Sequence, residues 1–416
     1  MKKIHILLIF LLLPGTIQFA GAQTYDCSGG RFFDSLYVVN VTQNVVYGNN
    51  NLYDGTPTDL TMDIYTPVGD PLAKRPLIIF APKGSFLQAD KQEEVMVKLC
   101  TRFASYGYTA AAINYRVGVD FTAVLSDPDG QFTYAVMRAV HDYRAAVRFF
   151  RKDAVTTNLY KIDTNYIIAG GSSAGAITAL HVAYLDEVSE IPTGVIDTTG
   201  LGGLEGLSGN PGYSSDVRYV VNLCGAIADT TWLRSGDQPL ISMHGDLDTE
   251  VPYGTATISI VIPIMEVDGS ASVAQRASHV GVENPFYTFW GRTHIPYDPN
   301  AGGNYGDYLD TVSLYVKSYL RDWICGYTGI EEDPSTEALD IWPNPASSHL
   351  NMTLGMVSGD FELSLSDLCG KILLSKEVNF TEGEIEVLNT SDLKAGIYLL
   401  RMKGDQGRYV KRVVIR

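Results

Sequence analysis

Apolar and polar positions alternate or cluster in the manner of β-strands near the start of the chain. Residues 37–48 and 59–66 follow this pattern, and the segments Asn-Asn-Asn and Asp-Gly-Thr-Pro lie between them. Turn-forming residues of this kind commonly separate paired strands. We therefore expect an antiparallel pair of strands at the beginning of the fold.

From Pro76 onward, short apolar runs alternate with longer segments of helical periodicity. Strands are predicted at 77–81, 108–114, 166–169, 218–224, 239–244 and 286–290, and helices at 90–106, 132–152 and 305–324. A strand followed by a helix and another strand implies a crossover connection and a parallel sheet. The predicted fold class is α/β, with a mostly parallel central sheet flanked by helices.

The pattern changes again after Gly326. Residues 327–340 include two glutamates, an aspartate and a proline in succession and are predicted to be an acidic linker. Residues 341–416 hold only short strand-like runs, at 349–354, 361–366, 371–378, 384–388, 397–402 and 408–415. Short strands separated by turn residues predict a small C-terminal all-β sandwich.

The first 22 residues have the pattern of a signal peptide. Two lysines precede an apolar run over 6–13, and Ala-Gly-Ala follows at 20–22. The apolar run is too short to span a bilayer. We therefore expect a secreted or cell-surface protein without a transmembrane anchor, whose first domain covers residues 23–326.

The net charge of the chain limits the classes of molecule that it can bind. The formal net charge is −16, and loss of the two signal-peptide lysines makes it −18. A surface of this sign repels nucleic acid. We expect no nucleic-acid partner.

The five cysteines are an odd number for a chain predicted to be exported. Cys27 and Cys325 are candidates for a disulfide that would close a large loop, which an oxidising compartment permits. Cys100 and Cys224 lie in apolar contexts typical of buried free thiols.

One connection is unusual in its length and composition. Residues 186–216 are rich in glycine between positions 200 and 212. A connection of this length without clear periodicity is uncommon inside a domain and is often functional. We expect it to form a cap or rim over a site.

The most informative stretch combines a strand, a sharp turn and a helix. An apolar run ends in Gly171-Ser-Ser-Ala-Gly175, and residues that can carry a helix follow. In a Gly-x-Ser-x-Gly turn, the glycines allow strand and helix to approach closely while the serine occupies a strained backbone conformation. Ser173 is therefore a candidate nucleophile.

A serine nucleophile needs a base, and the base needs an orienting acid. In this kind of fold the acid and then the histidine follow the serine along the chain, each after the end of a strand. Asp248 and Asp246 both follow strand 239–244; Asp248 is our choice and Asp246 the alternative. His294 follows strand 286–290, whereas His279 precedes it and would lie at the wrong end of the sheet.

The tetrahedral intermediate of acyl transfer needs backbone N–H donors. Ala174, directly after the candidate nucleophile, should supply one. Gly84 or Ser85, in the loop after strand 77–81, should supply the other, because Pro82 has no N–H group.

Taken together, these motifs resemble the secreted carboxylesterases of the α/β-hydrolase superfamily. The matching segments are Pro76 to Phe86, Asn114-Tyr-Arg116, Asp142 to Arg148, Gly171 to Gly175, His244 to Asp248 with Val251-Pro252, and Gly291 to Pro296. The resemblance implies a Ser173, Asp248 and His294 triad. One departure is the segment Pro82-Lys83-Gly84-Ser85, where relatives usually have a histidine followed by glycines. The histidine that commonly braces this loop is missing here.

The tail resembles the C-terminal sorting domains of type IX secretion. The matching segments are Trp342-Pro-Asn-Pro345, Asp367 to Lys371, Leu393 to Tyr398 and Lys411 to Val414. The resemblance implies that residues 341–416 engage the type IX secretion machinery.

The implied activity is hydrolysis of carboxylic esters through an acyl-enzyme on Ser173. Candidate substrates are small acyl or aryl esters, including acetyl or feruloyl esters of plant polysaccharide. Two alternatives remain open: a surface binding protein with impaired catalysis, suggested by Pro82 and Lys83, and a serine peptidase. We expect no metal and no cofactor, because the histidines are scattered and residues 246–248 lack the ligand count of a calcium loop.

Overall fold

The computed structural model describes residues 25–27, 30–192, 195–196, 200–259, 262–301, 305–326, 339–354, 357–367, 371–381, 385–404 and 407–415. The predicted signal peptide, residues 1–22, lies outside these residues. So does the predicted linker except for Leu339 and Asp340.

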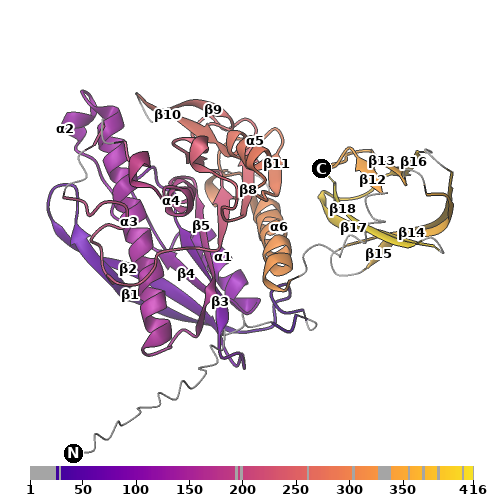
Figure 1. Ribbon diagram of the computed structural model, residues 1–416, viewed down its shortest axis with the longest axis horizontal. Coiled ribbons are helices and arrows are strands. Elements are labelled where there is room, and N and C mark those ends of the chain that lie inside the picture. The colour runs from indigo at the N-terminus through magenta and orange to yellow at the C-terminus, as the bar shows by residue number, and fades with distance from the viewer. Residues whose placement is uncertain are drawn as a thin grey trace, which may run out of the picture.

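A single eight-stranded sheet forms the centre of the first region (Figure 1). Its order is β1-β2-β4-β3-β5-β6-β8-β11, with β1, β2 and β4 paired antiparallel and the other neighbours parallel. The strands are β1 (Val39–Asn51), β2 (Pro57–Pro67), β3 (Arg75–Ala81), β4 (Thr109–Ile113), β5 (Ile162–Ser172), β6 (Tyr219–Leu223), β8 (Leu240–Gly245) and β11 (Phe286–Phe289). The predicted α/β fold class, with an antiparallel beginning and a parallel continuation, is confirmed.

Helices cover both faces of this sheet (Figure 1). Helices α3 (Pro128–Val155), α4 (Ala174–Tyr184) and α5 (Ser270–Val280) contribute to the hydrophobic core on one face, and α1 (Glu94–Ser105) and α6 (Tyr305–Ile324) to the core on the other. On β3, Leu77 and Ile79 belong to the first core, while Ile78 and Phe80 belong to the second. Burial on both faces explains why this strand is a continuous apolar run.

Several elements between β8 and β11 have no counterpart in the sequence-based prediction. Strands β9 (Thr255–Ser259) and β10 (Pro263–Gly269) pair antiparallel, and β10 also pairs with β7 (Ala226–Ile227). Helix α5 follows β10 directly. The short helix α2 (Phe121–Val124) is likewise not predicted.

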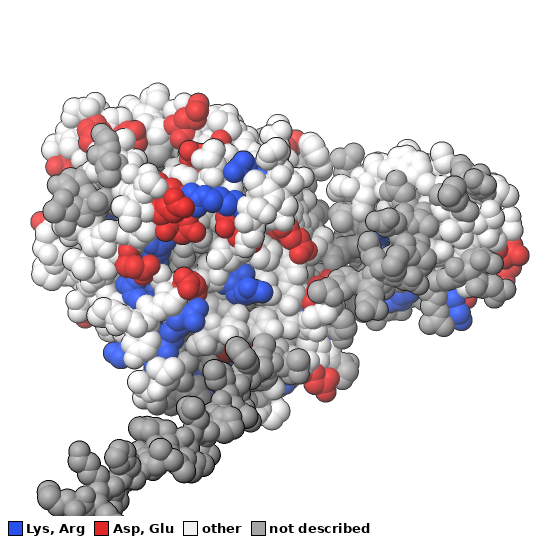
Figure 2. Space-filling model, in the orientation of Figure 1, with Lys and Arg blue, Asp and Glu red and all other residues white. Residues whose placement is uncertain are grey.

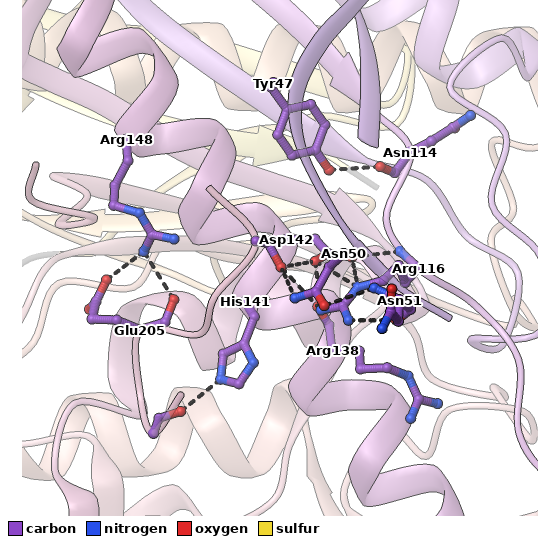
Figure 3. Close-up of polar contacts among 12 residues, drawn as sticks. Tyr47, Asn50, Asn51, Asn114, Arg116, Arg138, His141, Asp142, Arg148 and Glu205 are labelled. Carbon is purple, nitrogen blue, oxygen red and sulfur yellow. Dashed lines mark hydrogen bonds and ion pairs between the residues drawn. The ribbon is translucent and has the colours of Figure 1, made fainter. Parts of the chain in front are cut away.

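Residues 203–205 of the glycine-rich segment pack on α3. His141 and Arg148 of α3 bind them: His141 Nε2 lies 2.7 Å from the carbonyl oxygen of Gly203, and Arg148 Nη1 lies 2.7 Å from Glu205 Oε2 (Figure 3). A Cβ at Gly206 would lie 2.3 Å from the His141 ring. Glycine is therefore needed here for close packing against α3.

The C-terminal region consists of two antiparallel sheets that share one hydrophobic core. Their strand orders are β12-β13-β16 and β15-β14-β17-β18. The strands are β12 (Asp340–Trp342), β13 (His349–Thr353), β14 (Gly359–Asp367), β15 (Ile372–Phe380), β16 (Glu386–Asn389), β17 (Gly396–Gly404) and β18 (Gly407–Ile415). The predicted all-β class is confirmed, and β12 is an additional strand.

Cys27 and Cys325 are joined by a disulfide, with Cα atoms 6.1 Å apart. Cys100 and Cys224 are buried free thiols. In the part of the chain that the structure describes, no helix is both long enough and apolar enough to cross a membrane. On the face shown in Figure 2, acidic and basic side chains are interspersed among uncharged ones.

Candidate active site

The turn between β5 and α4 holds Ser173 in a strained conformation. Its φ is 53°, in the left-handed region that residues other than glycine rarely adopt. A Cβ at Gly171 would lie 2.2 Å from the backbone of Gly175, and one at Gly175 would lie 2.0 Å from the carbonyl oxygen of Ala81. The two glycines are therefore required by the close approach of β5, α4 and the end of β3.

His294 lies between Ser173 and Asp248. Its Nε2 is 2.8 Å from Ser173 Oγ, and its Nδ1 is 2.6 Å from Asp248 Oδ2. A carboxylate only accepts hydrogen bonds, so Nδ1 carries the proton and Nε2 of the neutral ring can accept the serine hydroxyl proton. The structure thus joins these three predicted residues in one chain of hydrogen bonds.

Asp248 is held by four donors. His294 Nδ1 and His244 Nε2 both lie near Oδ2, the latter at 3.0 Å, and the backbone N–H groups of Glu250 and Val251 donate to Oδ1. Burial acts to raise the pKa of Asp248, but the hydrogen bonds from His244 and His294 outweigh burial and lower it to about 2. Asp248 is therefore ionised throughout the neutral range.

The alternative residues lie elsewhere. The carboxylate of Asp246 accepts from the backbone N–H groups of Gly291 and Arg292, which ties the acid loop to the loop that carries His294. His279 lies in the last turn of α5. Of the two aspartates after β8, the structure brings Asp248 to His294.

The loop after β3 turns sharply at Gly84. Its φ is 132°, and a Cβ there would lie 2.1 Å from the carbonyl oxygen of Gln88. Ser85, Phe86 and Ala174 line the same cavity as Ser173, whereas Gly84 is not among the lining residues. Of the predicted backbone donors, Ser85 and Ala174 are therefore placed at the cavity, and Gly84 provides the turn.

The cavity has a volume of about 470 Å³ and is mostly apolar. Its walls come from α3, α4, the segment 226–232 and the β9–β10 hairpin. The lining includes Phe132, Val136, Met137, Ile177, Leu185, Trp232, Ile258, Ile264, Met265 and Val267. Of the predicted rim 186–216, Pro192 and Val195 are the described residues that line it.

Two family models match the chain. Residues 62–258 match BD-FAE, and residues 340–416 match the secretion system C-terminal sorting domain. The chain carries a BD-FAE domain. This domain is of the α/β-hydrolase esterase type, and a type IX sorting domain follows it.

Solved structures similar to this chain include forms of an esterase from Thermogutta terrifontis. Thermogutta terrifontis esterase 2 phosphorylated by paraoxon is 19% identical, with 68% of this chain and 94% of that chain covered and a TM-score of 0.47. The propionate-bound form is 18% identical, with 69% and 94% covered and a TM-score of 0.45. No curated protein sequence matches the chain.

The sequence motifs of the BD-FAE domain do not reveal most of its cavity wall. In the sequence, the lining residues of α3 and α4 have the pattern of ordinary buried helix positions. Those of the β9–β10 hairpin lie where no element is predicted. The apolar residues at 258, 264, 265 and 267 were the available signal. Their role depends on the hairpin folding back toward β7.

Besides His294, His181 of α4 lines this cavity. Its Nδ1 lies 2.8 Å from the carbonyl oxygen of Ile177, and its ring lies edge-on to that of Trp232. Burial lowers the pKa of His181 to about 4, so the ring is neutral near pH 7. It therefore contributes ring surface to the wall.

Within the described ranges, no group of three or more His, Cys, Asp or Glu side chains could hold a metal ion. Three carboxylates, those of Asp129, Glu250 and Glu266, are among the described residues that line the cavity, and no Lys or Arg is among them. Apolar surface and negative charge thus dominate the lining of this cavity.

Proposed function

We propose that the BD-FAE domain is a serine carboxylesterase that hydrolyses carboxylic esters through an acyl-enzyme on Ser173. The observation that carries the proposal is the chain of hydrogen bonds from Ser173 through His294 to Asp248, beside an apolar cavity. Such an arrangement activates a hydroxyl that is otherwise a weak nucleophile.

In the first half-reaction, Ser173 Oγ attacks the ester carbonyl carbon and its proton passes to His294 Nε2. The backbone N–H groups of Ala174 and Ser85 stabilise the oxyanion that forms. His294 then gives the proton to the leaving alkoxide, and the C–O bond of the ester breaks. The products of this half are the free alcohol and the acyl group on Ser173.

In the second half-reaction, water attacks the acyl-enzyme while His294 accepts one of its protons. The new tetrahedral intermediate collapses, the carboxylic acid leaves, and His294 returns the proton to Ser173 Oγ. Asp248 remains ionised and stabilises the transient imidazolium in both halves, in keeping with its lowered pKa.

We propose small acyl or aryl esters as substrates, with acetyl or feruloyl esters of plant polysaccharide as natural candidates. A cavity of about 470 Å³ is much larger than an acetyl group requires. Phe86, Phe132 and Trp232 in its lining suit an aromatic acyl group. We further propose that residues 1–22 are a cleaved signal peptide and that the protein is secreted or displayed at the cell surface.

The test is hydrolysis of p-nitrophenyl esters with acyl chains of about 2, 4, 8 and 12 carbons, and of methyl ferulate, chosen to span the cavity size. The full-length protein is compared with Ser173→Ala and with the control Ser189→Ala, which changes an exposed serine outside the cavity lining. We expect Ser173→Ala to reduce kcat by roughly 10⁴-fold or more and the control to be unchanged.

Each alternative predicts a different outcome. Equal inertness of wild type and Ser173→Ala on every ester would overturn the proposal and favour a binding protein of hydrolase fold. Faster cleavage of dipeptide p-nitroanilides than of esters would indicate a serine peptidase instead.

A further inference from the structure

The loop that carries Ser85 and the loop that carries His294 are joined by one lysine. Lys83, directly before Gly84, forms an ion pair with Asp298, which lies four residues after His294. Its Nζ also lies 3.1 Å from Glu93 Oε2, at the N-terminus of α1. One ammonium group thus contacts carboxylates from two other segments.

These carboxylates are largely removed from water. The side chain of Asp298 is 7% exposed and that of Glu93 is 15% exposed. Glu93 Oε1 is buried and has no hydrogen-bond partner among the described residues, and burial raises the pKa of Glu93 despite Lys83. A buried charge without a partner is energetically costly. The ammonium group of Lys83 offsets this cost by pairing with both carboxylates.

Both loops contain backbone that needs support. Ile295, next to His294, has a φ of 48°, and Ser85 and Phe86 have φ values of 55° and 61°. A residue in such a sparsely populated backbone conformation persists only when its surroundings fix it.

Two side chains that follow Ile295 anchor the loop that carries His294. Tyr297 is fully buried, and its hydroxyl lies 2.8 Å from Ser172 Oγ, next to the nucleophile. Asp298 is held by Lys83 on one oxygen and by the N–H group of Asn300 on the other, at 2.8 Å. The first anchor fixes the loop to the nucleophile's strand, and the second fixes it to the loop of Ser85.

We propose that Lys83 is a positioning residue that sets the distance between the backbone donor at Ser85 and the base His294. This inference rests on the proposed esterase function. The side chain of Lys83 points toward Glu93 and Asp298, and Lys83 is not among the residues that line the cavity.

The test compares Lys83→Met and Asp298→Asn, singly and together, in the full-length protein with p-nitrophenyl butyrate. Oxyanion stabilisation acts mainly in the transition state, and misplacement by about 1 Å can cost on the order of 100-fold. We therefore expect kcat to fall by roughly 10- to 100-fold in each single variant, with KM changed by less than about twofold. The double variant should lose no more than the larger single effect, because both remove the same link.

Two further variants separate positioning from stability. Lys83→Arg can still pair with both carboxylates and should restore most of kcat. Lys98→Met breaks an exposed pair with Glu94 on α1, where the side chains are 39% and 47% exposed, and should leave kcat unchanged.

The inference would be overturned if Lys83→Met lowered the melting temperature but kept the wild-type kcat at a temperature where it is folded. Additive losses in the double variant would also overturn it. If Lys83→Met does not fold, the test rests on Asp298→Asn alone. A wild-type kcat in Asp298→Asn would then overturn the inference. A wild type inactive on all esters would instead overturn the proposed function, and the inference with it.

Discussion

At the residue scale, a single carboxylate oxygen contacts two histidines. Asp248 Oδ2 lies near both His294 Nδ1 and His244 Nε2, and His244 Nε2 also lies 3.1 Å from the carbonyl oxygen of Val251. With two acceptors around it, His244 Nε2 must carry a proton. His244 Nδ1 lies 2.7 Å from Ser270 Oγ, so β8 and α5 both hold the acid in place.

This arrangement predicts a pH-dependent contribution to stability. The pKa of Asp248 is lowered from 3.8 to about 2, so its carboxylate stabilises the fold above pH 3.8 and loses that effect as the pH falls toward 2. We expect the free energy of unfolding of wild type to fall by about 2 kcal/mol more than that of Asp248→Asn between pH 5 and pH 2. Urea unfolding of both proteins at several pH values measures this difference. A difference that stays constant over this range would contradict the prediction.

The chain order of motifs was sufficient to select Ser173 and His294 as candidates. It left Asp246 and Asp248 as alternatives, because both follow the predicted strand 239–244 within four residues. Which carboxylate binds His294 depends on how the acid loop contacts residues 291–292. There, Asp246 accepts hydrogen bonds from two backbone N–H groups. That Ser85 lines the cavity while Gly84 does not likewise depends on backbone angles that residue types do not fix.

At the element scale, the unpredicted β9–β10 hairpin forms one wall of the cavity. Nearly every residue of β9 is exposed, so the strand has no alternation of buried and exposed positions that could reveal it. In α5 only Ser270, Val273 and Ala277 are buried, which gives too narrow an apolar stripe for a clear helical period. By contrast, β14 alternates at Phe361, Leu363 and Leu365, and its class was predictable.

The hairpin should control which esters are accepted, if the proposed esterase function holds. Ile258 lines the cavity, so Ile258→Trp should narrow it. We expect kcat/KM for p-nitrophenyl octanoate to fall about tenfold or more, and that for the acetate to change less than about twofold. Thr257→Trp, at an exposed neighbouring position outside the cavity lining, is the matched control. Equal losses on both esters would show that Ile258 does not limit acyl-chain length.

At the scale of the whole molecule, the order of strands was not available from periodicity. Apolar runs such as 77–81 and 166–169 predict buried strands, but β3 lies between β4 and β5, which follow it in sequence. That order depends on crossover connections and on helices covering both faces. The alternation of apolar runs and helical segments predicted a mostly parallel sheet flanked by helices, but no order of its strands.

A disulfide links the two ends of the first region. The disulfide joins Cys27 to Cys325, just after α6, across a sequence separation of 298 residues. Cross-linking such a long loop restricts the unfolded chain and typically stabilises a fold by about 2–4 kcal/mol. Cys27→Ser with Cys325→Ser should therefore lower the melting temperature by roughly 5 °C or more, measured by circular dichroism.

The reducing agent dithiothreitol provides the internal control for this prediction. It should lower the melting temperature of wild type toward that of the double-serine variant and leave the variant unchanged. Cys100 and Cys224 are buried, and burial raises the pKa of both thiols, so they should remain unreactive in the folded protein. If wild type melts at the same temperature with and without the reductant, while labelling shows that Cys27 and Cys325 are reduced, the disulfide does not stabilise this fold.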